Sequence, residues 1–185
     1  REIAPVVTKD QIIVSIAVGL TIQSYLDVLG EDKKVVRAMP NTPAAVQAGM
    51  TAFSFGENVT EEDQAKVLKL FSLAGGTSVL PERLMNAVSA LTGSSPAYVY
   101  MFIEAMGDAG CYAGIPRQQA YELAAQAVLG SAKMVLESGK HPAQLKDEVC
   151  SPGGTTIRAV AQLEKDGMRS AVIEAIRSCV DAAGK

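Results

Sequence analysis

Histidine is nearly absent from this chain of 185 residues, since His141 is the only one. A histidine-based metal site needs more than one, and a Ser-His-Asp triad would depend on this single residue, so neither is expected and no metal is assigned. Cysteine is also scarce: the three residues lie far apart without a CxxC pair, which argues against a disulfide framework or a zinc site. Free thiols suit a reducing compartment, and we therefore expect a cytoplasmic protein.

The chain has slightly fewer basic than acidic residues: 17 Lys and Arg and 20 Asp and Glu give a net charge of −3. That balance offers no electrostatic surface for nucleic acid or for an anionic membrane. No apolar run reaches the roughly 18 residues of a membrane span, and no signal peptide opens the chain. Hydrophobic residues make up 48% of the sequence, which excludes intrinsic disorder. The composition predicts a globular protein without nucleic-acid or membrane partners.

Residues 1–80 have the pattern of an α/β unit. The run 11–18 is nearly continuously apolar and β-branched, which is typical of a strand buried on both faces. Thr21 and Thr60 each precede a stretch of 3.6-residue apolar periodicity, so we expect them to cap helices that end at Gly30 and at Gly75-Gly76. Further strands are predicted at 34–38, at 50–55 and, as an edge strand, at 77–80.

The pattern changes at Pro81, after which no strand is predicted. Ser95 as N-cap and Pro96 at the first position begin a helix towards Gly110 or Gly114. Its side chains are apolar almost all round, so it must be buried on several sides. We expect two chains to pair through such helices, with a compact monomeric bundle as the alternative. Residues 81–185 thus form an all-helical domain, with the other helices at 81–91, 117–138 (rich in small alanines that permit close helix packing), 142–149, 155–165 and 168–183.

The segment that follows Cys150 has the features of an anion site. Gly153 and Gly154 let the backbone turn with its N–H groups inward, and a helix begins directly after them. The loop contains no lysine, which favours a carboxylate over a triphosphate. Ser151 and the glycines would hold this carboxylate, while Thr156 offers a hydroxyl to the same ligand. The alternative interpretation is that Ser, Gly and Thr simply cap a helix.

Two more segments lie at the carboxyl ends of predicted strands, at the edge where α/β proteins bind ligands. Met39-Pro40-Asn41 is stiffened by Pro40 and Pro43, although a rigid turn in which Asn41 caps its own backbone explains it equally well. Ile16-Ala17-Val18 is the other segment, where backbone can approach a flat ring closely. By itself it cannot be told from an ordinary turn between a strand and a helix.

Three runs of sequence resemble the pyrroline-5-carboxylate reductases, the last enzymes of proline biosynthesis. They are Val36-Arg-Ala-Met-Pro-Asn-Thr-Pro43, Ala87-Val-Ser-Ala-Leu-Thr-Gly-Ser-Ser-Pro-Ala-Tyr98 and Gln144-Leu-Lys-Asp-Glu-Val-Cys-Ser-Pro-Gly-Gly-Thr-Thr156. The last run is similar to the signature of that family, and the resemblance covers all 185 residues in register.

This resemblance implies a fold and an activity. The fold is the second part of a Rossmann-type α/β domain over 1–80, followed over 81–185 by an all-helical dimerisation domain like the C-terminal domain of 6-phosphogluconate dehydrogenase. The implied assembly is an interlocked homodimer, often built further into a decamer. The implied reaction is reduction of 1-pyrroline-5-carboxylate to L-proline by hydride transfer from NADPH or NADH.

The resemblance also assigns residues. Thr156 would orient the imine nitrogen as the catalytic hydroxyl, and Thr155 and Glu82 would join the substrate site. Glu82 also has a purely structural explanation, because an acidic residue in the first turn of a helix is stabilised by the helix dipole alone. Glu148 stands where some relatives carry an Asn that touches the cofactor, so that contact is not assigned. The cofactor would lie against Ile16, Ala17, Val18, Met39, Pro40 and Asn41.

The sequence departs from the family at Ser95, where Gly is usual, and in having no GxGxxG fingerprint after a strand. The chain also starts with Arg1 instead of a methionine, and we expect a fragment that binds NAD(P)H poorly and turns over little by itself. The choice between NADH and NADPH stays open for the same reason. Two other functions remain: a reductase of another small imine or keto acid, and a non-enzymatic helical dimerisation module. The second would be favoured if the loop 151–156 were filled by its own side chains.

Overall fold

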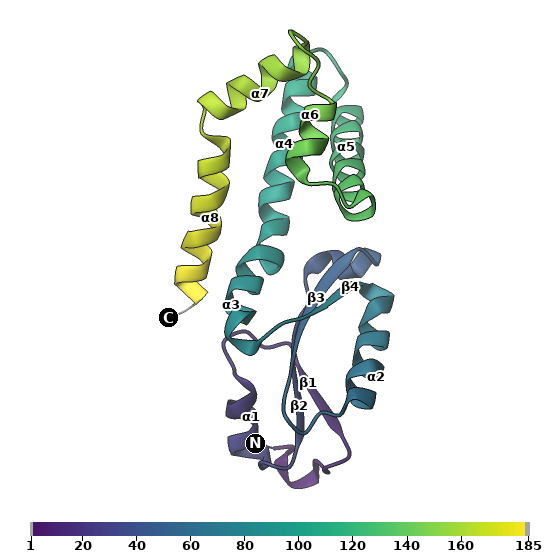
Figure 1. The fold of residues 1–185 in the computed structure, drawn as a ribbon, viewed down its shortest axis with the longest axis vertical. Coiled ribbons are helices and arrows are strands. Elements are labelled where there is room, and N and C mark those ends of the chain that lie inside the picture. The colour runs from purple at the N-terminus through teal and green to yellow at the C-terminus, as the bar shows by residue number, and fades with distance from the viewer. Residues whose placement is uncertain (1, 184–185) are drawn as a thin grey trace. The chain divides into compact units, whose positions relative to one another are not determined.

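The computed structural model describes residues 2–183, which fall into two compact units. The sheet unit comprises Arg1–Pro96 together with Ile176–Lys185, and the helical unit comprises Ala97–Ala175. The last strand ends at Val79, and helices follow it throughout the rest of the described chain (Figure 1). The predicted fold class, an α/β part followed by helices, is confirmed.

Four strands form one sheet in the order β1-β2-β3-β4. They are β1 (Ile12–Ser15), β2 (Lys34–Met39), β3 (Gly49–Phe55) and β4 (Gly75–Val79). The pairs β1/β2 and β3/β4 are parallel, whereas β2 and β3 are antiparallel. Because β1 and β2 are parallel, their carboxyl ends lie at the same edge of the sheet. Both segments predicted to meet the cofactor leave from that edge.

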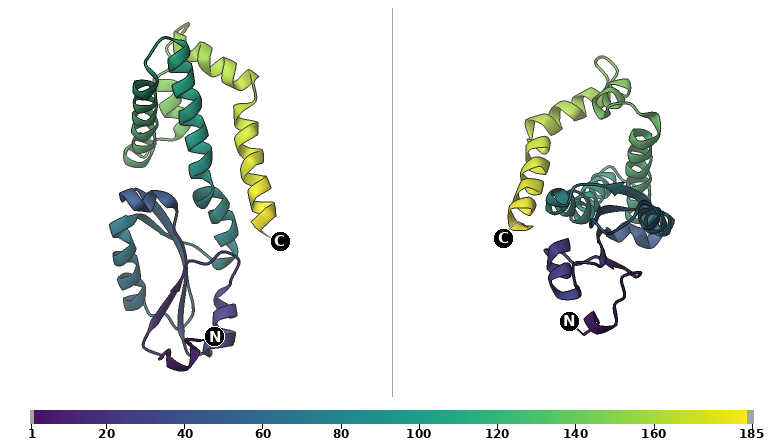
Figure 2. Two further views of the ribbon diagram at one scale, coloured as in Figure 1. Left: turned by 180° about the vertical axis from the view of Figure 1, so that it is seen from behind. Right: turned by 60° about the horizontal axis from the view of Figure 1, so that its bottom comes forward.

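The two faces of the sheet are covered by different helices (Figure 2). On one face, α2 (Glu61–Phe71) packs on an apolar cluster around Phe53, whose ring meets that of Phe71 edge-on with 5.1 Å between centroids. On the other face lie α1 (Ile22–Leu29) and the short α3 (Met85–Val88). Alternating strand residues point to opposite faces, so β2 contributes to both layers. The second cluster consists of Met39, Ala52, Met85 and Val88, with Leu80 packed against it.

The predicted helix caps of the sheet unit are confirmed. Thr21 accepts a hydrogen bond from the backbone nitrogen of Ser24 at 3.1 Å and so begins α1. Thr60 and Asp63 form a reciprocal capping box at the start of α2. Each cap gives an acceptor to an N–H that has no partner inside the helix, which is why these polar residues mark the helix starts in the sequence.

Two predicted boundaries in the sheet unit are wrong. The first strand ends at Ser15 instead of residue 18, because the Ser15 hydroxyl accepts from the nitrogen of Ala17 at 3.2 Å and draws the chain out of the ladder. The helix expected to reach Gly75 ends at Phe71, and Gly75 opens β4 instead. Gly75 has φ +140°, and a Cβ there would lie 2.0 Å from the carbonyl oxygen of Gly49, so the position requires glycine.

The N-cap predicted at Ser95 is also wrong. The segment expected as one helix over 81–91 consists of a 3₁₀ turn, α3 and a π-helical turn (Ser89–Gly93), and Ser94 keeps helical dihedrals up to α4 (Ser95–Tyr112). Pro96 has no N–H, so the carbonyl of Thr92, four residues earlier, loses its helical donor. The side-chain nitrogen of Asn41 replaces that donor at 3.0 Å. A helix can therefore pass through the proline without a fresh start.

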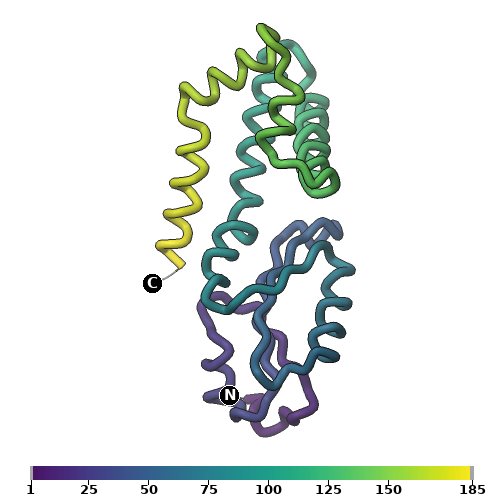
Figure 3. Tube along the Cα trace, in the orientation of Figure 1, coloured from purple at the N-terminus to yellow at the C-terminus, as the bar shows by residue number. Residues whose placement is uncertain are grey.

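In the helical unit, α5 (Arg117–Ser138) returns beside α4 (Figure 3). Small residues permit this approach, as predicted: a Cβ at Gly107 would lie 2.2 Å from the Tyr121 ring, and one at Gly110 would lie 2.9 Å from the Cβ of Ala120. The remaining helices closely match the predicted ranges: α6 (Pro142–Glu148), α7 (Thr155–Lys165) and α8 (Met168–Ala183).

Large apolar side chains of the helical unit stay exposed in a single chain. Tyr100, Met101 and Leu136 are 58%, 67% and 83% exposed. A single chain thus leaves the burial predicted for the Pro96 helix incomplete. None of the helices within residues 2–183 has both the length and the apolar character needed to cross a lipid bilayer.

Candidate functional site

The carboxyl edge of the parallel strands carries the first part of the candidate site. Ile16 and Val18, directly after β1, are 61% and 63% exposed, so their apolar surface is open to a ligand. Gly19 follows with φ +83°, which turns the chain towards α1. Met39, at the end of β2, is buried with Met85 and Val88, so its side chain belongs to the core. A ligand at this edge would therefore meet the backbone of Met39 rather than its thioether.

Asn41 uses both ends of its amide to hold backbone. Its Oδ1 accepts from the nitrogen of Met50 at 2.8 Å, and its Nδ2 donates to the carbonyl of Thr92 at 3.0 Å. The side chain is thereby fixed as a bridge between the start of β3 and the π-helical turn. The expected alternative, in which Asn41 caps its own backbone, is not what the structure shows. Pro40 beside it is half-buried, and a 3₁₀ turn over Thr42–Val46 continues the loop.

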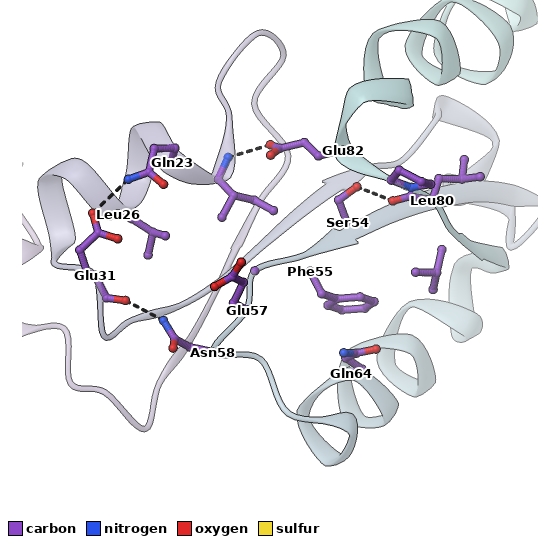
Figure 4. Close-up of a pocket in the computed structure, with 14 residues that line it drawn as sticks. Gln23, Leu26, Glu31, Ser54, Phe55, Glu57, Asn58, Gln64, Leu80 and Glu82 are labelled. Atoms are coloured by element: carbon purple, nitrogen blue, oxygen red, sulfur yellow. Dashed lines mark hydrogen bonds between the residues drawn. The ribbon is translucent and has the colours of Figure 1, made fainter.

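Glu82 reaches across to α1. Its Oε1 accepts a hydrogen bond from the backbone nitrogen of Ile22 at 2.7 Å (Figure 4). The carboxylate therefore stabilises the positive end of α1 rather than that of its own short turn. Glu82 also lines a pocket of about 660 Å³ in the sheet unit, together with Ile22, Ser54 and Glu57.

The sequence interpretation missed two residues at this edge, Arg37 and Asn86. Arg37 lies in the middle of β2, is 4% exposed and donates to Glu82 at 3.4 Å and to Asn86 at 3.3 Å. Asn86 in turn donates to the carbonyl of Ala183 at 3.1 Å. A charged residue inside the apolar strand Lys34–Met39 was the available signal, since arginine is almost never fully buried without a partner.

The predicted substrate loop lies in the helical unit, before α7. Gly153 has φ +70°, and the nitrogen of Gly154 donates to the carbonyl of Ser151 at 3.0 Å, so the loop makes a tight turn. Gly154 is the N-cap residue of α7, and no side-chain hydrogen bond caps this helix. Thr155 and Thr156 are exposed. The positive end of an eleven-residue helix is thus open to an anion, with two hydroxyls beside it.

The candidate residues divide between the two units. Glu82 and the segments around Ile16–Val18 and Met39–Asn41 belong to the sheet unit, whereas Ser151–Thr156 belong to the helical unit. Each unit alone therefore carries one part of the predicted site: a sheet edge suited to a flat ring, and a helix terminus suited to a carboxylate.

Three further titratable residues have structural partners. His141 caps α6, with Nδ1 accepting from the nitrogen of Ala143 at 3.1 Å. Glu148 pairs with Lys140 at 2.8 Å, and Asp108 pairs with Arg117 at 2.5 Å. Within residues 2–183, no group of three His, Cys, Asp or Glu side chains could hold a metal ion.

Comparison with known proteins places the chain in a family. A family model described as pyrroline-5-carboxylate reductase dimerisation matches residues 82–185. The Escherichia coli pyrroline-5-carboxylate reductase is 55% identical over 184 residues, which covers 100% of this chain and 68% of that protein. The enzyme of a Synechocystis strain is 49% identical over 167 residues, covering 90% of this chain and 62% of the relative.

Solved structures of similar fold indicate the same family. A pyrroline-5-carboxylate reductase from Coxiella burnetii superposes with a TM-score of 0.93 at 34% identity, covering 99% of this chain and 68% of that one. The Plasmodium falciparum enzyme, solved with NADP bound, gives a TM-score of 0.85 at 34% identity, covering 94% and 70%. With relatives this similar along its whole length, the chain belongs to the pyrroline-5-carboxylate reductase family.

Proposed function

We propose that this chain acts in the reduction of 1-pyrroline-5-carboxylate to L-proline, with NADPH or NADH as hydride donor. The observation that carries the proposal is the 55% identity with the Escherichia coli reductase over 184 residues. The NADP bound in the Plasmodium falciparum relative supports a nicotinamide cofactor. The reaction needs a hydride at the imine carbon and a proton on the ring nitrogen, and it yields proline and the oxidised nicotinamide.

The substrate residues of this proposal lie around the start of α7. The uncapped N–H groups of that helix and the turn of Ser151, Gly153 and Gly154 bind the substrate carboxylate. The Thr156 hydroxyl hydrogen-bonds the ring nitrogen and orients the imine, and Thr155 lies beside it. The nitrogen can arrive already protonated, so a strong protein acid is not needed. That explains how a chain with one histidine, engaged in capping α6, can belong to a reductase.

The cofactor residues of the proposal lie at the sheet edge. Exposed Ile16 and Val18, with Ala17 between them, offer apolar surface to a flat ring, and the backbone of Met39, Pro40 and Asn41 borders it. When bound, the nicotinamide supplies the hydride. No GxGxxG follows a strand in this sequence, so nothing comparable anchors the phosphates. We therefore expect this chain by itself to bind NADPH more weakly than micromolar, and calorimetry that gives micromolar affinity would contradict this.

Assembly and compartment complete the proposal. Two copies pair through the helical unit, in line with the family model that matches residues 82–185. Further assembly into a decamer stays a prediction. All three cysteines are free thiols, which suits the reducing cytoplasm.

The decisive experiment measures which substrate drives NADPH oxidation in a protein of the relatives' full length. We expect 1-pyrroline-5-carboxylate to give a higher kcat/KM than other small cyclic imines and keto acids. A preference for one of those would make this a reductase of a different substrate. An absence of oxidation with every substrate, in a folded and dimeric protein, would leave a dimerisation module instead.

A further inference from the structure

Arg37 occupies a place where an apolar residue would serve stability better. It lies in β2 between Ser15 of β1 and Ser54 of β3, and its neighbours on the same face, Val35 and Met39, are buried and apolar. Taking a guanidinium out of water is costly, and well-packed apolar residues often replace buried ion pairs without loss of stability. A buried charge at this position therefore calls for another reason.

The bonds that Arg37 makes are long and incomplete. Nη1 donates to Oε1 of Glu82 at 3.4 Å and Nη2 to Oδ1 of Asn86 at 3.3 Å, and both distances exceed the usual upper limit of about 3.2 Å for N–H···O bonds. Its Nε is buried and has no partner among the described residues. A side chain selected for stability alone would satisfy all of its donors, because each buried donor without an acceptor is destabilising.

What Arg37 holds is the carboxylate that fixes the start of α1. Oε1 of Glu82 accepts from Arg37 and, at 2.7 Å, from the backbone nitrogen of Ile22. At the other end of the same loop, the Ser15 hydroxyl accepts from Ala17 and contacts the Tyr25 hydroxyl. The loop between Ser15 and Ile22 is thus tied to the sheet at both ends. Its residues Ile16–Val18 are those proposed to contact the nicotinamide.

We infer that Arg37 is a positioning residue of the reductase: by holding Glu82 against the N-terminus of α1, it sets the loop on which the nicotinamide ring lies. The inference rests on the proposed function. The bonds from Arg37 and Ile22 both use Oε1 of Glu82 and neither involves Oε2. That oxygen stays available for the substrate contact proposed for Glu82, and Arg37 fixes its direction.

The test compares Arg37→Met, which keeps an unbranched stem as far as the position of Nε but removes every donor, with Arg37→Lys and with Lys34→Met. Lys34 lies on the same strand but faces the other side of the sheet, where it pairs with Asp63 at 2.7 Å. It is the matched control, because its loss removes an ion pair without touching the loop.

In a protein of the relatives' full length, we expect Arg37→Met to lower kcat about 10- to 100-fold, since a misplacement of about 1 Å can reduce a rate 10²-fold. The KM for NADPH should change less than about threefold, because most of the cofactor's anchoring lies elsewhere. Arg37→Lys should recover part of kcat, and Lys34→Met should keep kcat while lowering Tm. Unchanged kcat in Arg37→Met, or an equal loss in Lys34→Met, would overturn the inference.

Two further measurements separate positioning from folding. Hydrogen exchange of the Ile22 amide, followed by NMR in this chain, should speed up at least tenfold in Arg37→Met but not in Lys34→Met. In the background of Glu82→Gln, Arg37→Met should cost less than about threefold more in kcat, because it acts through Glu82. If the two substitutions instead lower kcat independently, so that their fold-losses multiply in the double variant, Arg37 does not act through Glu82. If the unmodified protein fails to reduce 1-pyrroline-5-carboxylate, the proposed function is wrong. The hydrogen-exchange rate of the Ile22 amide still tests whether Arg37 holds Glu82 against α1.

Discussion

The two units of this chain solve the problem of burial differently. The sheet unit encloses its own core: Val35, Val36 and Phe53 are completely buried between the sheet and its helices. In the helical unit the buried hydrophobic residues are Ala120 and Ala124, whereas larger side chains such as Met101 and Leu136 face outwards. One unit therefore encloses an apolar core within a single chain, whereas the other leaves most of its large apolar side chains uncovered.

The same difference explains the two kinds of sequence pattern. In the sheet unit, apolar residues recur on one face of the helices, and β2 buries residues on both faces between helices of the same chain. In α4 apolar residues lie almost all round the helix, and in a single chain Tyr100, Met101 and Phe102 stay exposed. A groove lined by Phe102, Met106, Val128 and Val135 runs between α4 and α5, and it is largely apolar. Substitutions in each unit test this difference between the sheet unit and the helical unit.

The largest effect is expected from a charge in that groove. The unmodified chain should be at least a dimer, and Phe102→Glu should turn it into monomers or unfold its helical unit, because an unpaired carboxylate would be buried in the interface. Sedimentation equilibrium measures the change. The control is Leu70→Glu on α2, because Leu70 is also a large apolar residue and is more exposed than Phe102 (65% against 41%) but lies on the sheet unit. A stable monomer of the unmodified chain at micromolar concentration would contradict the dimer.

The next largest effect is expected on stability, when a phenylalanine of each unit is replaced by alanine. Phe53→Ala should lower the free energy of unfolding by about 3–5 kcal/mol, because it leaves a cavity in the core of the sheet unit. The loss should not depend on protein concentration. Phe102→Ala should instead lower a Tm that rises with concentration, since its packing partners come from a second copy. Thermal denaturation of both variants at several protein concentrations measures this difference. If Tm depends on concentration in the same way for both, the two units do not differ in how they are buried.

A third prediction concerns the chemistry of the helical unit. In a protein of the relatives' full length, Thr156→Val keeps the shape of the side chain but removes the hydroxyl. A hydrogen bond to a charged group contributes about 1.5–3 kcal/mol, so kcat/KM should fall roughly 10- to 150-fold with Tm unchanged. Thr155→Val should cost less. A lowered Tm with unaltered kcat/KM would favour helix capping, and full activity would remove Thr156 from the mechanism.

The smallest effect is a pH dependence confined to the sheet unit. Hydrogen bonds from Lys34 and Thr60 lower the pKa of Asp63 from 3.8 to about 2. A depressed pKa in the folded state adds stability above pH 4 that is lost as the pH falls towards 2. Asp63→Asn should therefore lower Tm at pH 6 but much less at pH 2. Glu137→Gln, from an exposed pair with Lys133 in the helical unit, should change neither value.

Local signals in the sequence predicted most helices and strands. Thr21 and Thr60 marked helix starts because a cap needs only residues three positions apart. Ser95 gave the same signal and misled, because the carbonyl freed by Pro96 finds its donor in Asn41, more than fifty residues away in the chain. Likewise, the hydroxyl of Ser15 ended β1 earlier than the apolar run did.

The sequence by itself determined the fold class, the family, the open glycine turn before α7 and the excess of apolar helix surface, since composition, periodicity and short motifs are local properties of the chain. Only the tertiary structure decided that Met39 belongs to the core, that Asn41 holds the π-helical turn and that Glu82 meets Arg37 and α1. Those contacts join residues far apart in sequence, and a buried polar group takes whichever partner the packed strands and helices bring within hydrogen-bonding distance.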